Sequence, residues 1–131
     1  MTRYMLDTNT VSYLMRGHAA VEKAVFSKDY ADLCISCLTE AELLYGVNRK
    51  PEATRRAKMV HEFLDRIESL AWGSKEAACY GSLRATMERS GKSLQPTDML
   101  IAAHALATGA VLVTSDMAFR HVPGITVEDW R

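Results

Sequence analysis

Short runs of apolar residues alternate along the chain with longer segments whose apolar residues recur every three or four positions. The first pattern is typical of buried strands and the second of helices with one buried face. The clearest strand candidates cover residues 4–6, 33–36 and 110–113, and weaker ones cover residues 70–72 and 125–127. Because helical segments separate the strands, the pattern predicts an α/β protein whose parallel sheet carries helices on both faces.

Six helices are expected around these strands, several of them bounded by glycine or proline. The first begins at a cap on Thr8 or Asn9 and ends near residue 16. The others are expected over residues 19–27, 38–47, 51–69, 75–90 and 96–108. In the third helix Thr39 is the predicted N-cap, because Glu42 follows it at the spacing of a capping box. The last helix is apolar nearly all round, which indicates a central, well-buried position.

The composition is that of an ordinary globular protein, with 48% hydrophobic and 24% charged residues. A length of 131 residues suits one domain spanning residues 1–131. The formal net charge is zero, so any nucleic-acid binding has to come from a local cluster of basic residues. No apolar run approaches the roughly 18 residues that cross a membrane, and no signal segment opens the chain. We therefore expect a cytoplasmic protein without membrane association.

Four acidic residues lie where a predicted strand ends or a predicted helix begins, namely Asp7, Glu42, Asp98 and Asp116. Each also has an ordinary structural explanation, as a helix cap, a capping-box partner, a helix-start acid or a turn residue. In an open parallel sheet, however, the carboxyl ends of the strands share one edge, and ligands bind there. The four carboxylates are therefore candidates for a common site at that edge.

A common site would bring four like charges together. Two unit charges about 5 Å apart repel by roughly 3 kcal/mol at an effective dielectric constant of ~20. Four carboxylates therefore need a bound cation or raised pKa values. Oxygen ligands of this kind suit Mg²⁺ or Mn²⁺, and such ions, singly or as a pair, lower the pKa of bound water and stabilise charge on a phosphoryl group. If the acids converge, the chemistry they predict is hydrolysis of phosphodiester bonds.

Four segments resemble, in order, the motifs of the PIN domain, and most closely those of the VapC-type toxins of bacterial toxin–antitoxin pairs. They contain all four acidic residues and lie within residues 4–119. In sequence order they are Met5-Leu6-Asp7-Thr8-Asn9, Thr39-x-x-Glu42-Leu43 followed by Gly46, Asp98-x-x-Ile101-Ala102-Ala103-x-Ala105, and Val113-Thr114-Ser115-Asp116-x-x-Phe119. Each motif is weak alone, and their order makes the resemblance specific.

The resemblance implies a three-layer α/β/α PIN-like fold around a parallel sheet of four to five strands in the order 3-2-1-4-5. It also implies an endoribonuclease that depends on Mg²⁺, or on Mn²⁺ in its place. Such a toxin would inhibit translation and growth by hydrolysing RNA, with tRNA as the expected target. The implied partners are a VapB-type antitoxin and a second toxin chain, in a homodimer within the toxin–antitoxin complex.

The resemblance also assigns roles to residues of this sequence. The acidic catalytic residues would be Asp7, Glu42, Asp98 and Asp116. Within that set the expected metal ligands are Asp7, Asp98 and Asp116. Hydrogen bonds from side chains next to a metal site orient its carboxylates. The residues expected to do so are Asn9 and Thr114, with Thr8 and Ser115 as weaker candidates.

The densest basic run of the chain is a candidate RNA-binding surface, because a local positive patch attracts phosphates. Its members are Arg49, Lys50, Arg55, Arg56 and Lys58, and these five charges against that of Glu52 leave a local charge of +4. Lys92, in the loop before Asp98, is a further candidate. The alternative is a solvated helix face that binds nothing. Candidates for a groove that binds the antitoxin are Leu44, Tyr45, Met59 and Phe63, with core packing as the alternative.

Two other function classes fit parts of the sequence. One is a catalytically silent PIN-like binding module that acts only through its partner. The other is a magnesium-dependent phosphatase of the haloacid dehalogenase type, whose first strand also ends in Asp. That class needs a second Asp two residues later, where this chain has Asn9. The presence of all four acids favours an enzyme over a silent module.

Overall fold

The structure, a computed structural model that describes residues 2–131, is built around a five-stranded parallel sheet. The strands are β1 (Tyr4–Leu6), β2 (Leu33–Ser36), β3 (Glu68–Leu70), β4 (Val111–Val113) and β5 (Val127–Glu128). Their order in the sheet is β3-β2-β1-β4-β5, so the first strand of the sequence lies at the centre. The α/β class, the parallel pairing and the order 3-2-1-4-5 expected from the sequence are confirmed.

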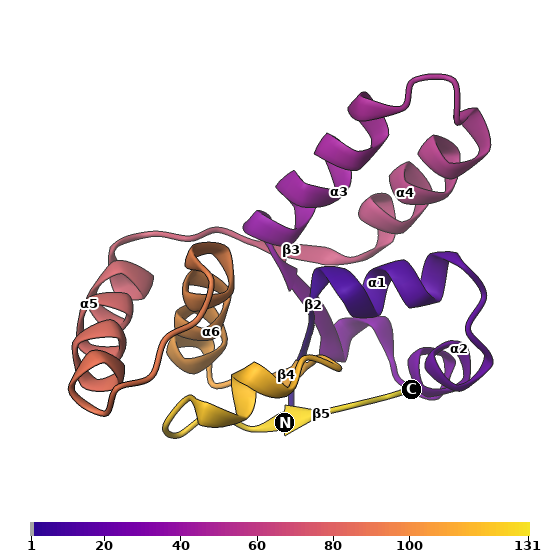
Figure 1. Cartoon of the computed structure of the whole chain (residues 1–131). Helices are drawn as coiled ribbons and strands as arrows, with labels where there is room; N and C mark the ends of the chain where they lie inside the picture. The colour runs from indigo at the N-terminus through magenta and orange to yellow at the C-terminus, as the bar shows by residue number, and fades with distance from the viewer. Residues whose placement is uncertain (1) are drawn as a thin grey trace.

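Helices cover both faces of this sheet and complete three layers (Figure 1). They are α1 (Thr8–Met15), α2 (Ala19–Phe26), α3 (Cys37–Arg49), α4 (Thr54–Arg66), α5 (Ser74–Arg89) and α6 (Pro96–Thr108), with 3-10 helices η1 (Tyr30–Asp32) and η2 (Met117–His121). Helices α1 to α4 pack on one face, and α5 and α6 on the other. Within residues 2–131, none of the helices is both long enough and apolar enough to cross a membrane.

The strands divide their buried side chains between two hydrophobic cores. In β1, Met5 packs with α5 and α6, whereas Leu6 packs with α1 to α4. The same division separates Leu112 from Val113 in β4. Successive side chains of a strand point to opposite faces of the sheet. Because both faces are covered, the central strands are continuous apolar runs in the sequence, which made them recognisable.

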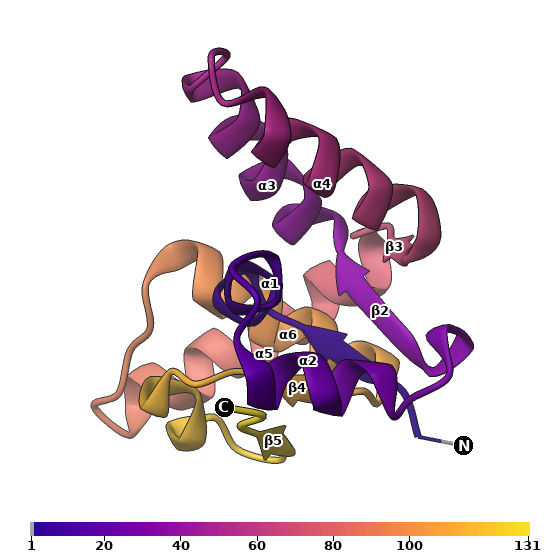
Figure 2. The same ribbon diagram turned by 90° about the vertical axis from the view of Figure 1, so that its right-hand side faces the viewer.

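Helices α3 and α4 pack against each other and extend away from the sheet (Figures 1 and 2). We call this pair the α3–α4 arm. Helix α3 begins directly after β2, so its first turns lie beside the sheet. The turn at residues 50–53, which joins the two helices, forms the far tip of the arm.

Three predicted elements have boundaries that are wrong by a few residues. The helix expected over residues 51–69 covers only Thr54–Arg66, and Glu68–Leu70 pairs with β2 as strand β3. Val60, Phe63 and Ile67 continue one helical stripe in the sequence, but Ile67 is buried in an extended conformation at the end of α4. Strand β3 therefore begins two residues before the predicted strand at 70–72, and β5 begins two residues after the start of the predicted strand at 125–127.

The predicted capping box at the start of α3 is also wrong. The N-cap is Ser36, whose Oγ accepts a hydrogen bond from the Leu38 backbone N–H at 3.1 Å. Thr39 is buried in the first turn, and its hydroxyl has no hydrogen-bond partner among the described residues. Strand β2 runs to Ser36 without an intervening loop, so the helix starts earlier than the local spacing of polar residues indicates.

Ser36 has a second contact, which joins the end of β2 to α6. Its Oγ lies 2.8 Å from Nδ1 of His104, a fully buried residue of α6, and the two are hydrogen-bonded. Burial lowers the pKa of His104, so the ring is neutral at pH 7. His104 is therefore a structural residue, which ties α6 to the junction of β2 and α3.

Substitutions at Ser36 and Thr39 distinguish the observed cap from the predicted one. Ser36→Ala should lower the free energy of unfolding by about 2 kcal/mol, because it removes the helix cap and leaves a His104 nitrogen unpaired. Thr39→Val removes only an unpaired hydroxyl of similar shape, so its stability should stay within about 0.5 kcal/mol of the parent or exceed it. Urea denaturation measures both. Equal losses in the two variants would contradict the assignment of the cap.

Candidate active site

Asp7 is the first residue after the central strand and forms the N-cap of α1. Its Oδ1 accepts a hydrogen bond from the Thr10 backbone N–H at 2.8 Å, and its side chain is only 4% exposed. Of the caps the sequence allowed for this helix, Asp7 is confirmed, and Thr8 or Asn9 is wrong. Burial raises the pKa of Asp7 above its usual value of 3.8, and hydrogen bonds from Thr114 and Thr10 offset part of that rise.

Two threonines fasten Asp7 to the neighbouring strand β4. The Thr10 hydroxyl donates to the Val113 carbonyl oxygen at 2.9 Å, and the Asp7 N–H donates to the same oxygen at 3.1 Å. Buried Thr114, from the end of β4, hydrogen-bonds the Asp7 carboxylate and accepts the Asp116 N–H at 3.0 Å. Thr114 thus contacts two of the predicted acids, as expected from the sequence. Thr10 was not predicted, and its only sequence signal is its position three residues after an N-cap Asp.

Asp98 shows that the four acids share one neighbourhood. It lies in the first turn of α6, and its pKa is raised, first by burial and then by the charges of Asp116, Glu42 and Asp7. Repulsion of this kind acts between carboxylates that lie close together. Asp116 follows β4, where its Oδ1 accepts the Ala118 N–H at 2.9 Å. The acids therefore gather at the carboxyl-terminal edge of the sheet, as the sequence predicted.

Glu42 reaches this edge from the first half of α3. Its Oε1 accepts a hydrogen bond from the Thr8 hydroxyl at 2.7 Å, in place of the predicted contact with the start of its own helix. Thr8, a weaker candidate, therefore holds a site carboxylate. Asn9 is exposed, and within residues 2–131 its side chain makes no hydrogen bond, so its expected role stays a prediction. The side chain of Ser115, in the same described range, makes none either.

The carboxylates form a suitable set of ligands for a hard divalent cation. Within residues 2–131 no three acidic, histidine or cysteine side chains are arranged to hold an ion as they stand. None of the four acids forms an ion pair with a described lysine or arginine, so their mutual repulsion is not neutralised by the protein. Oxygen donors with uncompensated negative charge fit Mg²⁺ or Mn²⁺. The buried and half-buried members of the set, Asp7, Asp98 and Asp116, are the best placed to hold one.

The predicted RNA-binding residues are accessible but lie on separate segments. The basic run occupies the outer part of the α3–α4 arm, and all its members are exposed, namely Arg49, Lys50, Arg55, Arg56 and Lys58. Lys92 is exposed in the loop between α5 and α6. None of these six forms an ion pair with a described acid. Their charges are therefore free to meet phosphates.

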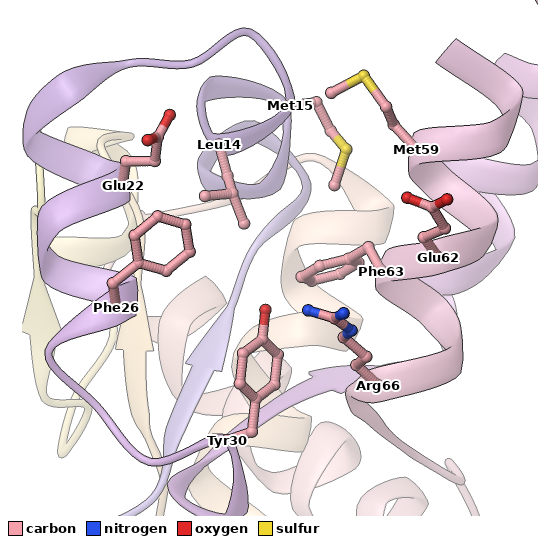
Figure 3. A pocket seen from close by; sticks show the side chains of 9 residues that line it. All are labelled: Leu14, Met15, Glu22, Phe26, Tyr30, Met59, Glu62, Phe63 and Arg66. Carbon is pink, nitrogen blue, oxygen red and sulfur yellow. The ribbon is translucent and has the colours of Figure 1, made fainter. Parts of the chain in front are cut away.

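An apolar groove of about 240 Å³ lies on the face covered by α1, α2 and α4 (Figure 3). Its lining residues are Leu14, Met15, Glu22, Phe26, Tyr30, Met59, Glu62, Phe63 and Arg66. Two of the four predicted groove residues, Met59 and Phe63, belong to it, whereas Leu44 and Tyr45 do not. Sequence reasoning missed the contributions of α1 and α2. Phe26, which the structure shows to be 68% exposed, is the main residue that it overlooked.

Relatives of known name share this sequence along its whole length. The PIN domain family matches residues 4–125. Over 131 residues the chain is 34% identical to the tRNA(fMet)-specific endonuclease VapC of Salmonella typhimurium, with 99% of each chain covered. It is 33% identical to the Ribonuclease VapC2 of Haemophilus influenzae, again with 99% of each chain covered.

Solved structures agree with these relatives. VapBC2 of Rickettsia felis, bound to a DNA fragment from their promoter, matches with a TM-score of 0.91 and 31% identity, covering 99% of this chain and 100% of that one. DNA-bound VapBC of Salmonella typhimurium matches with a TM-score of 0.91 and 34% identity over the whole of both chains. The family match, the curated relatives and the solved structures all indicate the same family. The chain belongs to the PIN domain family, among the VapC ribonucleases.

Proposed function

We propose that the protein is the toxin of a type II toxin–antitoxin pair and a metal-dependent endoribonuclease that cleaves tRNA in the cytoplasm. The observation that carries this proposal is the cluster of four carboxylates, supplied by four separate segments, at one edge of the sheet. The tRNA target is supported by a relative of 34% identity that is named as a tRNA(fMet)-specific endonuclease. Cleavage of tRNA would stop translation and growth.

Asp7, Asp98 and Asp116 would hold Mg²⁺ or Mn²⁺. A bound ion of this kind lowers the pKa of water and stabilises negative charge on a phosphoryl group. Thr114 acts on the Asp7 carboxylate and holds the backbone N–H of Asp116, and the N–H of Thr10 fixes the rotamer of Asp7. The protein thereby presents its oxygen donors in a fixed arrangement.

Glu42 has a different part in the proposed reaction. Thr8 fixes one of its two carboxylate oxygens, at 2.7 Å, which leaves the other free to accept a hydrogen bond from the attacking water. Glu42 is exposed, so solvent water reaches it without any rearrangement of the chain. Its proposed role is to orient the water for attack on the phosphorus atom.

Asp7→Asn tests the catalytic role of Asp7 separately from its capping role. Asn also caps helices, so the variant should fold, whereas cleavage should fall by about 100-fold or more, as when one charge-stabilising group is removed. Gel assays of RNA cleavage measure this, and EDTA should abolish wild-type cleavage until Mg²⁺ or Mn²⁺ is added. Full activity in the folded variant would exclude the mechanism, and RNA binding without any wild-type cleavage would favour the silent binding module.

The same variant should be more stable than the wild type when EDTA is present at pH 7. The pKa of Asp7 is higher in the folded state than its usual value of 3.8, so its ionisation lowers stability as the pH rises through the folded pKa. Asn has no such ionisation. Its melting temperature should exceed that of the wild type by about 3–5 °C for each 1 kcal/mol that the buried charge costs, and the difference should vanish near pH 3. Thermal unfolding between pH 3 and 7 measures this, with Asp7→Ala, which lacks the cap, as the control. An advantage that did not change with pH would contradict burial of the charge as its cause.

The protein partner we propose is a VapB-type antitoxin, bound in the apolar groove of α1, α2 and α4. Support comes from the solved VapBC structures of 31% and 34% identity. The groove offers three exposed or half-buried aromatic and sulfur-containing side chains, Phe26, Tyr30 and Met59, which suit the apolar face of a helix. A toxin homodimer within the complex, which the family resemblance implies, is part of the same proposal.

Phe26→Ala should weaken antitoxin binding by about tenfold or more, because aromatic side chains seated in a groove dominate binding energy. Phe26 is 68% exposed in the free chain, so the substitution should leave its stability almost unchanged. Calorimetric titration with a VapB-type antitoxin that binds the wild-type chain measures the effect. The control is Arg89→Ala, an exposed change on α5 away from the groove. Equal affinities of the Phe26→Ala variant and the control would move the antitoxin site elsewhere.

A further inference from the structure

A second exposed aromatic side chain, Tyr45, lies outside the groove. It is 64% exposed on α3, three residues after Glu42. Residues three, four and seven apart share one face of a helix. Glu42, Tyr45, Gly46 and Arg49 therefore form a single line along α3, which we call the α3 stripe.

The outer half of the α3 stripe is an aromatic ring paired with a cation. The Arg49 guanidinium lies 5.6 Å from the centre of the Tyr45 ring. Both side chains are exposed, and Arg49 has no ion-pair partner among the described residues. The face of an aromatic ring can stack on a base, and an unpaired guanidinium can bind a phosphate.

Gly46 leaves the middle of the stripe bare. A Cβ atom built there would meet nothing within 4 Å, so space for a ligand lies directly against the helix backbone. Glycine inside a helix costs about 1 kcal/mol relative to alanine. No neighbouring group packs against Gly46 to offset this loss of helix stability. One use of glycine at such a position is to let another molecule approach the backbone closely.

The stripe starts in the candidate active site and ends in the basic part of the arm. Glu42, at its inner end, lies among the acids that act on Asp98. Arg49, at its outer end, opens the basic run, whose local charge is +4. Arg49 follows Glu42 by seven positions, which is about 10 Å along the helix axis. The stripe therefore reaches the nucleotides next to a phosphate held by the acids.

We propose that the α3 stripe binds an unpaired stretch of the substrate RNA. A base stacks on Tyr45, the sugar–phosphate backbone passes over Gly46, and a phosphate meets Arg49. This inference rests on the proposed ribonuclease function. Double-stranded RNA keeps its base faces stacked inside the helix, so the stripe selects loops and single strands.

A protein segment is the other ligand that the α3 stripe could bind. The positive charge at its outer end favours RNA instead. The stripe offers one exposed aromatic ring, a bare backbone and an increasingly positive outer end. An apolar helix of a partner would find a much larger apolar surface in the groove of α1, α2 and α4. A chain of phosphates matches the positive end of the stripe.

The test measures RNA binding apart from cleavage, in the non-cleaving Asp7→Asn protein. Fluorescence anisotropy with a labelled unpaired oligoribonucleotide gives the affinity. Adding Tyr45→Ala should weaken binding by about tenfold, the size typical of one lost stacking contact. Tyr45→Phe keeps the ring and should bind within about twofold of the parent. Tyr80→Ala, on α5, is the control for loss of a tyrosine away from the stripe and should leave the affinity unchanged.

Two further substitutions separate ligand contact from a structural role. Gly46→Leu should not lower the melting temperature, because Leu favours helix more than Gly, yet it should weaken RNA binding as Tyr45→Ala does. Arg49→Ala should reduce the slope of log affinity against log salt concentration by about 1, as expected for one lost phosphate contact. Arg89→Ala, on α5, should leave that slope unchanged.

The outcomes distinguish this proposal from the function on which it rests. If the parent binds RNA and the Tyr45→Ala and Gly46→Leu variants bind it equally well, the α3 stripe is not an RNA site. If those variants keep RNA but release the antitoxin, the stripe is a protein interface and the proposal is wrong. Failure of the parent to bind RNA also overturns it, whereas wild-type cleavage with and without EDTA decides separately on the ribonuclease function.

Discussion

Burial of the Asp7 carboxylate is the constraint around which the acidic edge of this protein is arranged. The side chain sits at the end of the central strand, 4% exposed, where water cannot fully solvate its charge. Three other carboxylates add repulsion to the same neighbourhood. The fold answers with fixed hydrogen-bond donors, the Thr10 N–H and the Thr114 hydroxyl, which lower the pKa of Asp7 against the effect of burial. The start of α1 supplies one donor and the end of β4 the other. The segments that end the strands and start the helices therefore also hold the Asp7 carboxylate.

The stability that offsets these buried and repelling charges has to come from other parts of the molecule. The two cores on the faces of the sheet contain the buried apolar residues of every helix, and the Ser36–His104 contact ties α6 to the end of β2. Sites that bind substrates and metals commonly lower the stability of the fold that carries them. Here the unfavourable charges are confined to one edge of the sheet, where a cation or a substrate can reach them.

Much of the fold was predictable because the strands are apolar on both faces and separated by helices. The four acids were predictable because each occurs where a predicted strand ends or a predicted helix begins. The caps were not. Ser36 and Thr39 both suit an N-cap locally, and the choice depends on where β2 stops pairing with its neighbours.

The same limit applied to the hydrogen bonds of the acidic site. Thr8 and Asn9 are adjacent polar residues of one motif, and only the packing of α3 against α1 decides that Thr8 meets Glu42, 34 residues away. Ile67 continues a helical spacing although it is extended, because a buried position satisfies both patterns. Local sequence therefore identified the chemistry, and tertiary contacts selected the residues that hold it in place.

The central place of β1 in the sheet has a consequence for how the protein is made. Asp7 leaves the ribosome early, but the contact that secures its junction to β4, between the Thr10 hydroxyl and the Val113 carbonyl, joins residues 103 positions apart. Such distant pairing forms late and slowly. Thr114 and Asp116 follow Val113, so the catalytic edge stays incomplete until this last part of the chain has been synthesised. Because of this strand order, the acidic site of the nuclease cannot assemble until almost all of the sequence has been translated.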